Sequence, residues 1–147
     1  MMTEPQTEHF DIIVVGAGLG GIYALHSFSQ QGYKVIGVEQ ANQLGGVWNL
    51  NRYPGSRVDI EPVIYSYYFS DELYRDWRWR DRYPTQPEIL NYLNHVADML
   101  DVRRLIRFNA GVIGANWRPE VERYDLNTAD GRKLSCRFLV MATGNLT

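Results

Sequence analysis

The sequence contains one cysteine, Cys136, and three scattered histidines, so it offers neither a disulfide framework nor the spacing of a metal site. No apolar run approaches the roughly 20 residues of a membrane-spanning helix. Neither charge dominates, because 15 basic and 17 acidic residues give a formal net charge of −2. A chain of this balance has no general attraction to nucleic acid or to an anionic membrane. We therefore expect no metal, no nucleic acid and no membrane among its partners.

The first nine residues are polar and acidic and lack the basic and apolar regions of a signal peptide. We interpret residues 1–9 as a flexible tail and predict a cytoplasmic protein. The chain has 147 residues, of which 45% are hydrophobic, and this suits one globular domain. We place that domain at residues 10–147.

The most informative stretch is FDIIVVGAGLGG at residues 10–21. Its β-branched run predicts a strand that is buried on both faces. Gly16, Gly18 and Gly21 then follow at the spacing G-x-G-x-x-G. In such a turn the first glycine permits a tight bend, the second allows a pyrophosphate to approach the backbone, and the third lets the next helix pack closely. The N–H groups at the start of that helix favour an anion.

A second apolar strand, predicted over residues 33–39, ends in Glu39, which follows Gly16 by 23 residues. An acid at this distance is typical of a ribose-binding carboxylate in a dinucleotide site. A glycine-rich turn alone is weak evidence, because such turns are common. Strand, glycine turn, helix, strand and acid in this order predict a dinucleotide site.

The remaining sequence completes an α/β pattern. Residues 40–85 show no clear periodicity and are interpreted as a functional loop. Thr85 and Glu88 have the spacing of a capping box at the start of a helix. Strands are predicted at residues 105–108, 111–117, 123–128 and 138–141, with the middle two antiparallel. This order predicts a Rossmann-like parallel sheet with helices and a small antiparallel meander. Ligands bind at the carboxyl ends of such strands, where the glycine turn, Glu39 and Thr143-Gly144 lie.

Basic and aromatic residues alternate over residues 75–83, a pattern that single-stranded nucleic acid can use. Two acidic residues interrupt the segment, and the domain is not basic overall. We therefore interpret it as a packed, partly solvated loop.

Four segments closely resemble the N-terminal FAD-binding region of Baeyer–Villiger monooxygenases, which are class B flavin-containing monooxygenases: GAGLGG, GGVWNLNRYPGSRVD, RYPTQPEILNYLNHVAD and VMATG. The resemblance spans residues 10–146 and is most specific over residues 45–59. The family's F-x-G-x-x-x-H-x-x-x-W fingerprint and second glycine-rich domain, for NADPH, do not occur in this sequence. The resemblance therefore implies a partial FAD-binding domain from the amino-terminal part of such an enzyme.

The resemblance also implies a set of cofactor contacts. The FAD pyrophosphate is expected at the three motif glycines and the adenosine ribose at Glu39. Val112 is expected to meet the adenine, and the segment 57–59 to meet the nicotinamide cofactor. Asp59 is expected to support a catalytic arginine that lies outside this sequence. The expected cofactor-binding residues are Gly16, Gly18, Gly21, Glu39, Gly46, Val47, Trp48, Asn49, Leu50, Arg57, Val58, Asp59, Tyr65, Val112, Thr143 and Gly144.

For the parent enzyme the resemblance implies that NADPH reduces FAD, that O2 reacts with the reduced flavin, and that one oxygen atom enters a ketone to give an ester or lactone. The 147-residue chain alone is expected to be inactive. Three alternatives stay open: a monooxygenase that oxidises nitrogen or sulfur, a non-catalytic nucleotide-binding module, and an NAD-binding dehydrogenase domain. Glu39 would serve the ribose of NAD equally well, whereas the loop at 45–59 and the ATG turn favour FAD.

Overall fold

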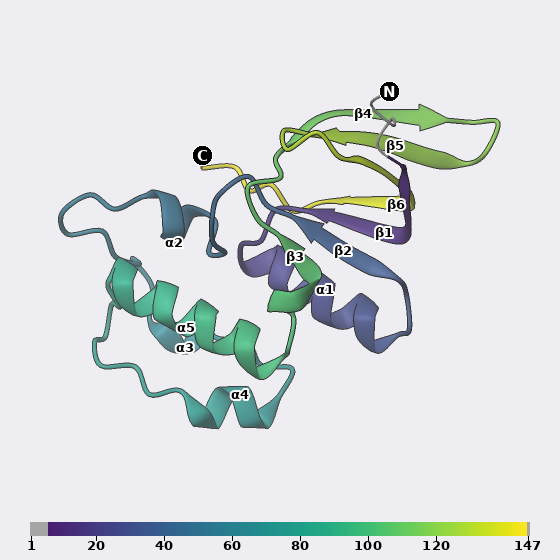
Figure 1. The fold of residues 1–147 in the computed structure, drawn as a ribbon. Coiled ribbons are helices and arrows are strands. Elements are labelled where there is room, and N and C mark those ends of the chain that lie inside the picture. The colour runs from purple at the N-terminus through teal and green to yellow at the C-terminus, as the bar shows by residue number, and fades with distance from the viewer. Residues whose placement is uncertain (1–5, 147) are drawn as a thin grey trace.

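A six-stranded mixed sheet forms the centre of the computed structural model, which describes residues 6–146 (Figure 1). The elements in chain order are β1 (Glu8–Val15), α1 (Leu19–Gln30), β2 (Val35–Val38), α2 (Val47–Leu50), α3 (Pro62–Tyr65), α4 (Asp71–Asp76), α5 (Gln86–Met99), the 3-10 helix η1 (Arg103–Leu105), β3 (Ile106–Arg107), β4 (Val112–Arg118), β5 (Arg123–Thr128) and β6 (Lys133–Met141).

The strands lie in the order β3-β2-β1-β6-β5-β4. Strands β3, β2, β1 and β6 run parallel, whereas β5 pairs antiparallel with both β6 and β4. The carboxyl ends of β1, β2 and β6 therefore lie on one edge of the sheet. The predicted Rossmann-like fold with an antiparallel meander is confirmed.

Strand β1 is buried on both faces, as its β-branched sequence predicts. Ile12 and Val14 pack in one core cluster with Leu25 of α1 and Leu93 of α5. Ile13 faces the other way and packs with Leu126 of the meander. Figure 1 shows α1 and α5 together on one side of the sheet. Each large apolar side chain buried in this way stabilises the fold by about 1.5–3 kcal/mol.

Part of the predicted tail belongs to the sheet instead. Residues 1–5 lie outside the described part of the chain, but Glu8 and His9 already belong to β1. The strand extends because Glu8 and His9 pair with Leu134 and Ser135 of β6. In addition, the Glu8 carboxylate forms two hydrogen bonds, of 2.8 and 2.6 Å, with the guanidinium of Arg107.

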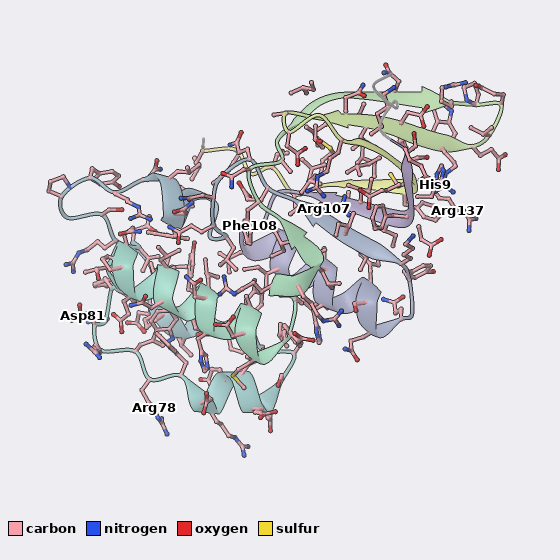
Figure 2. The ribbon with its side chains drawn as sticks, in the orientation of Figure 1. His9, Arg78, Asp81, Arg107, Phe108 and Arg137 are labelled. Atoms are coloured by element: carbon pink, nitrogen blue, oxygen red, sulfur yellow. The ribbon has the colours of Figure 1, made fainter. Side chains whose placement is uncertain are left out.

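The segment at residues 40–85 contains three short helices, α2, α3 and α4, where the sequence showed no periodicity. Helices of four to six residues contain too few turns for a period to appear. In the loop after α4, Trp77 and Trp79 are half-buried, and Arg78 points outward (Figure 2). This arrangement agrees with a packed, partly solvated loop.

The hydrogen bonds of the capping box predicted at the start of α5 do not form, so this prediction is wrong. Thr85 is the N-cap residue, but its side chain forms no capping hydrogen bond. The Glu88 carboxylate accepts a 2.7 Å hydrogen bond from the backbone N–H of Arg80 instead. The glutamate is thus engaged by the preceding loop rather than by the helix terminus.

Within residues 6–146, no helix has the length and apolar character needed to cross a membrane. The same residues contain no cluster of three or more histidine, cysteine or acidic side chains suited to a metal ion. Cys136 lies fully buried on β6, and burial raises the pKa of its thiol to about 11. The thiol therefore stays protonated at neutral pH.

Candidate functional site

A cavity of about 690 Å³ opens at the carboxyl ends of β1, β2 and β6. It brings together segments that are far apart in the sequence: the glycine turn, the end of β2, the loop that carries α2, the start of β4, and residues 141–146. Ten of the predicted site residues line it, namely Gly16, Gly18, Glu39, Gly46, Val47, Trp48, Leu50, Val112, Thr143 and Gly144. A second cavity, of about 530 Å³, is lined by residues between 61 and 82 and does not include the strand ends.

The glycine turn presents the N-terminus of α1 to the cavity. Gly18 is the N-cap residue of this 12-residue helix, and no side chain caps it. No acidic residue occupies its first turn, and Leu19 and Gly20 line the cavity. The first backbone N–H groups of a helix have no partner within the helix, and the helix dipole is positive at this end. The turn therefore suits an anionic group such as a pyrophosphate.

Glu39 connects the second strand to the glycine turn. The residue is 5% exposed, and its two carboxylate oxygens accept 2.8 Å hydrogen bonds from the backbone N–H groups of Ala17 and Ala41. A carboxylate has about four acceptor positions, so two bonds leave capacity for a ligand hydroxyl. Glu39 thus fixes the turn and can still accept a hydrogen bond at the cavity.

A second wall of the cavity is the loop that carries α2. The Gly45 N–H donates a 2.9 Å hydrogen bond to the carbonyl of Ala17, which ties this loop to the glycine turn. The buried side chain of Gln86, at the start of α5, donates to the carbonyl of Trp48. The loop is therefore anchored both to the glycine turn and to a helix of the core.

Six predicted site residues do not line the cavity: Gly21, Asn49, Arg57, Val58, Asp59 and Tyr65. Arg57 and Asp59 are exposed, and the Arg57 guanidinium donates to the carbonyl of Tyr83 at 3.4 Å. Val58 and Asn49 are buried, and the Asn49 amide bonds with Gln43. Roles for these residues at the cofactor stay predictions.

Several lining residues were not predicted, among them Ala17, Leu19, Gly20, Gln40, Gly45, Gly111, Asn145 and Leu146. Ala17, Leu19, Gly20 and Gly45 lie inside the recognised motifs, so their position beside the glycines could have identified them. Gln40 and Gly111 carry no such signal. They meet because the chain after β3 returns beside β2, where a Cβ on Gly111 would lie 3.1 Å from that of Gln40.

The fold and the cavity together define a Rossmann-like dinucleotide-binding unit. Residues 14–78 match the family model described as "NAD(P)-binding Rossmann-like domain". The chain is 44% identical over 139 residues to a Baeyer-Villiger monooxygenase of Pseudooceanicola batsensis, and 41% identical over 141 residues to acetone monooxygenase (methyl acetate-forming) of Gordonia sp.. These alignments cover 94% and 96% of this chain, and 26% of each relative.

Solved structures agree with these relatives. Oxidised steroid monooxygenase bound to NADP superposes with a TM-score of 0.93 and 50% identity, over 95% of this chain and 27% of that protein. A complex of OTEMO with FAD and NADP superposes with a TM-score of 0.90 and 37% identity, over 97% of this chain and 27% of that protein. The chain is homologous to the N-terminal region of Baeyer–Villiger monooxygenases and spans about a quarter of their length.

One relative is named for a different reaction. Phenazine N-monooxygenase of Lysobacter antibioticus is 38% identical over 147 residues, covering 99% of this chain and 27% of the relative. Similarity in this region therefore extends across flavin monooxygenases of more than one activity.

Proposed function

We propose that the cavity at the ends of β1, β2 and β6 binds FAD, and that this chain is the FAD-binding part of an NADPH-using monooxygenase. The observation that carries the proposal is the meeting of an uncapped helix N-terminus, the Glu39 carboxylate and the α2 wall around one cavity. The N-terminus of α1 suits the pyrophosphate, and Glu39 suits the adenosine ribose.

The α2 wall favours FAD over NAD. Beyond the phosphate turn, the cavity continues along Gly46, Val47, Trp48 and Leu50, which gives apolar and aromatic surface for a flavin ring. FAD, when bound, supplies the oxygen-activating chemistry, while NADPH supplies electrons. The residues of this chain bind and orient the cofactor. We assign Arg57 and Asp59, which are both exposed, to the nicotinamide side.

The proposed reaction is the insertion of one oxygen atom from O2 beside a ketone carbonyl, in the cytoplasm. The relatives named Baeyer-Villiger monooxygenase and acetone monooxygenase support a ketone substrate. The phenazine N-monooxygenase supports a second candidate, oxidation at nitrogen. Both candidates use the same cofactor cavity.

The first test uses a protein in which this chain is continued to the length of its relatives, referred to below as the full-length form. We expect it to be yellow, to hold FAD in a 1:1 ratio and to oxidise NADPH faster when a ketone is added. Ester or lactone products are detected by mass spectrometry. Residues 1–147 alone are expected to form no ester.

A panel of aromatic N-heterocycles separates the two candidates, since N-oxide products without esters would favour oxidation at nitrogen. A colourless full-length form that binds NAD instead of FAD would contradict the cofactor assignment.

A second prediction concerns Glu39. We expect Glu39→Ala to raise the Kd for FAD by about tenfold to a hundredfold, because removing a charged acceptor costs about 1.5–3 kcal/mol. It should also lower stability, because the N–H groups of Ala17 and Ala41 lose their carboxylate acceptor. FAD titration and urea denaturation of the full-length form measure both effects.

Gln40→Ala, at an exposed neighbouring position, should change stability by less than about 0.5 kcal/mol. Normal FAD affinity in Glu39→Ala would refute the ribose assignment.

A further inference from the structure

Two tyrosines that are almost adjacent in the sequence bond with two different segments that line the cofactor cavity. The hydroxyl of Tyr65, the last residue of α3, accepts a 2.5 Å hydrogen bond from the indole Nε1–H of Trp48. The hydroxyl of Tyr67 donates a 2.5 Å hydrogen bond to the carbonyl of Leu19, the first residue of α1. Trp48 and Leu19 both line the cavity, on the flavin side and on the phosphate side.

The segment that carries these tyrosines is itself held firmly. The backbone N–H of Tyr67 donates a 2.8 Å hydrogen bond to the hydroxyl of Tyr92, a residue of α5 that is 1% exposed. Between the two tyrosines, the hydroxyl of Ser66 accepts a 3.0 Å hydrogen bond from the Trp79 indole. The segment is thus fixed to the core helix α5 and to the loop after α4.

Burial favours the protonated form of both phenols, and Tyr67 needs its proton in order to donate. Burial raises the pKa of Tyr65, with a smaller contribution from the negative charge of Asp59, while the bond from Trp48 opposes the shift. Burial also raises the pKa of Tyr67 well above its usual range, aided by Tyr92 and Tyr65. Both hydroxyls therefore stay protonated at physiological pH, so that Tyr67 can donate to Leu19.

We propose that Tyr65, Ser66 and Tyr67 form a strut that sets the separation of the two cavity walls, with Tyr65 and Tyr67 as positioning residues for the cofactor. One end holds the indole of Trp48, which also packs edge-to-face on Tyr65 with ring centroids 5.8 Å apart. The other end holds the first residue of the phosphate-binding helix. The two walls are also bonded to each other, because the Gly45 N–H donates to the carbonyl of Ala17. Releasing either end of the strut should therefore loosen both walls. The effect on FAD rests on the proposed function, whereas the mechanical coupling of the walls does not.

The test uses Tyr65→Phe, Tyr67→Phe and the double variant in the full-length form, because phenylalanine keeps the ring and removes only the hydroxyl. Hydrogen exchange without ligand is the first measurement. We expect each single variant to raise amide exchange in both walls, at residues 16–20 and at residues 45–50. Faster exchange only in the wall that a tyrosine contacts, or in neither wall, would overturn the strut.

FAD affinity is the second measurement. Loss of one neutral hydrogen bond should raise the Kd by roughly two- to tenfold, with a shift in the visible circular dichroism of the bound flavin. The double variant should bind almost as well as either single variant, because one broken end already releases the strut. If the affinity losses of the two single variants multiply in the double variant and the flavin spectrum is unchanged, the two hydrogen bonds act independently. That result would contradict the strut.

Tyr68→Phe is the matched control. Its ring stacks on Tyr74, with centroids 5.6 Å apart, and it is exposed. We expect this variant to leave wall exchange and FAD affinity unchanged. If the wild-type protein binds no FAD, the proposed function is wrong. The exchange measurement still tests whether the strut couples the two walls.

Discussion

Gly21→Ala is expected to destabilise the protein by about 3 kcal/mol or more, at the upper end of what overpacking costs. A Cβ on Gly21 would lie 2.0 Å from the carbonyl oxygen of Gly16 and 2.9 Å from its carbonyl carbon. Both atoms belong to the backbone of the turn and cannot rotate away. Relief would require α1 to move off β1, and that movement would open the core around Ile22 and Leu25. Urea denaturation monitored by circular dichroism measures the change.

Gly20→Ala is the control for this prediction. It makes the same chemical change one residue earlier in the same helix, where a Cβ would meet no atom within 4 Å. Alanine is a better helix former than glycine by about 1 kcal/mol, so this variant should be as stable as the wild type or more so. Equal denaturation midpoints for the two variants would show that close helix packing is not the reason for a glycine at position 21.

Gly18→Val is expected to fold and to lose FAD affinity by at least about a hundredfold, which corresponds to about 2.8 kcal/mol. The backbone of Gly18 has φ −83°, so a side chain brings no conformational strain. A Cβ there would lie 3.6 Å from the Cα of Gly46, an ordinary contact. The stability cost should therefore stay near the 1 kcal/mol typical of a poor N-cap residue. The added methyl groups would occupy the space where the pyrophosphate approaches the turn.

Gly114→Val in β4 tests whether any added valine weakens binding. A Cβ on Gly114 would meet no atom within 4 Å, and this residue does not line the cavity. The variant should keep normal FAD affinity in the same titration. If Gly18→Val purified with stoichiometric FAD, the phosphate site would have to lie elsewhere in the protein.

The order of the main elements and the position of the site follow from local patterns in the sequence. The run of residues 12–15, the glycine turn and Glu39 are local signals, because burial, bending and charge act on consecutive residues. Parallel strands bring their carboxyl ends to one edge, and so Gly16, Glu39 and Thr143 could be assigned to one cavity before its geometry was known. The meander was also predictable, since its strands alternate and are joined by a turn.

Which atoms form the contacts of the site depends on the folded chain. Glu39 accepts hydrogen bonds from the backbone N–H groups of Ala17 and Ala41. Because almost every residue has a backbone N–H, the sequence does not show which of these groups a carboxylate will bind. Glu88 bonds with the loop before α5 instead of with its own helix end, because a folded neighbour competes for the same carboxylate. Tyr65 and Tyr67 bond with two different cavity segments although they are two residues apart. Such contacts depend on packing between distant segments, which local periodicity does not encode.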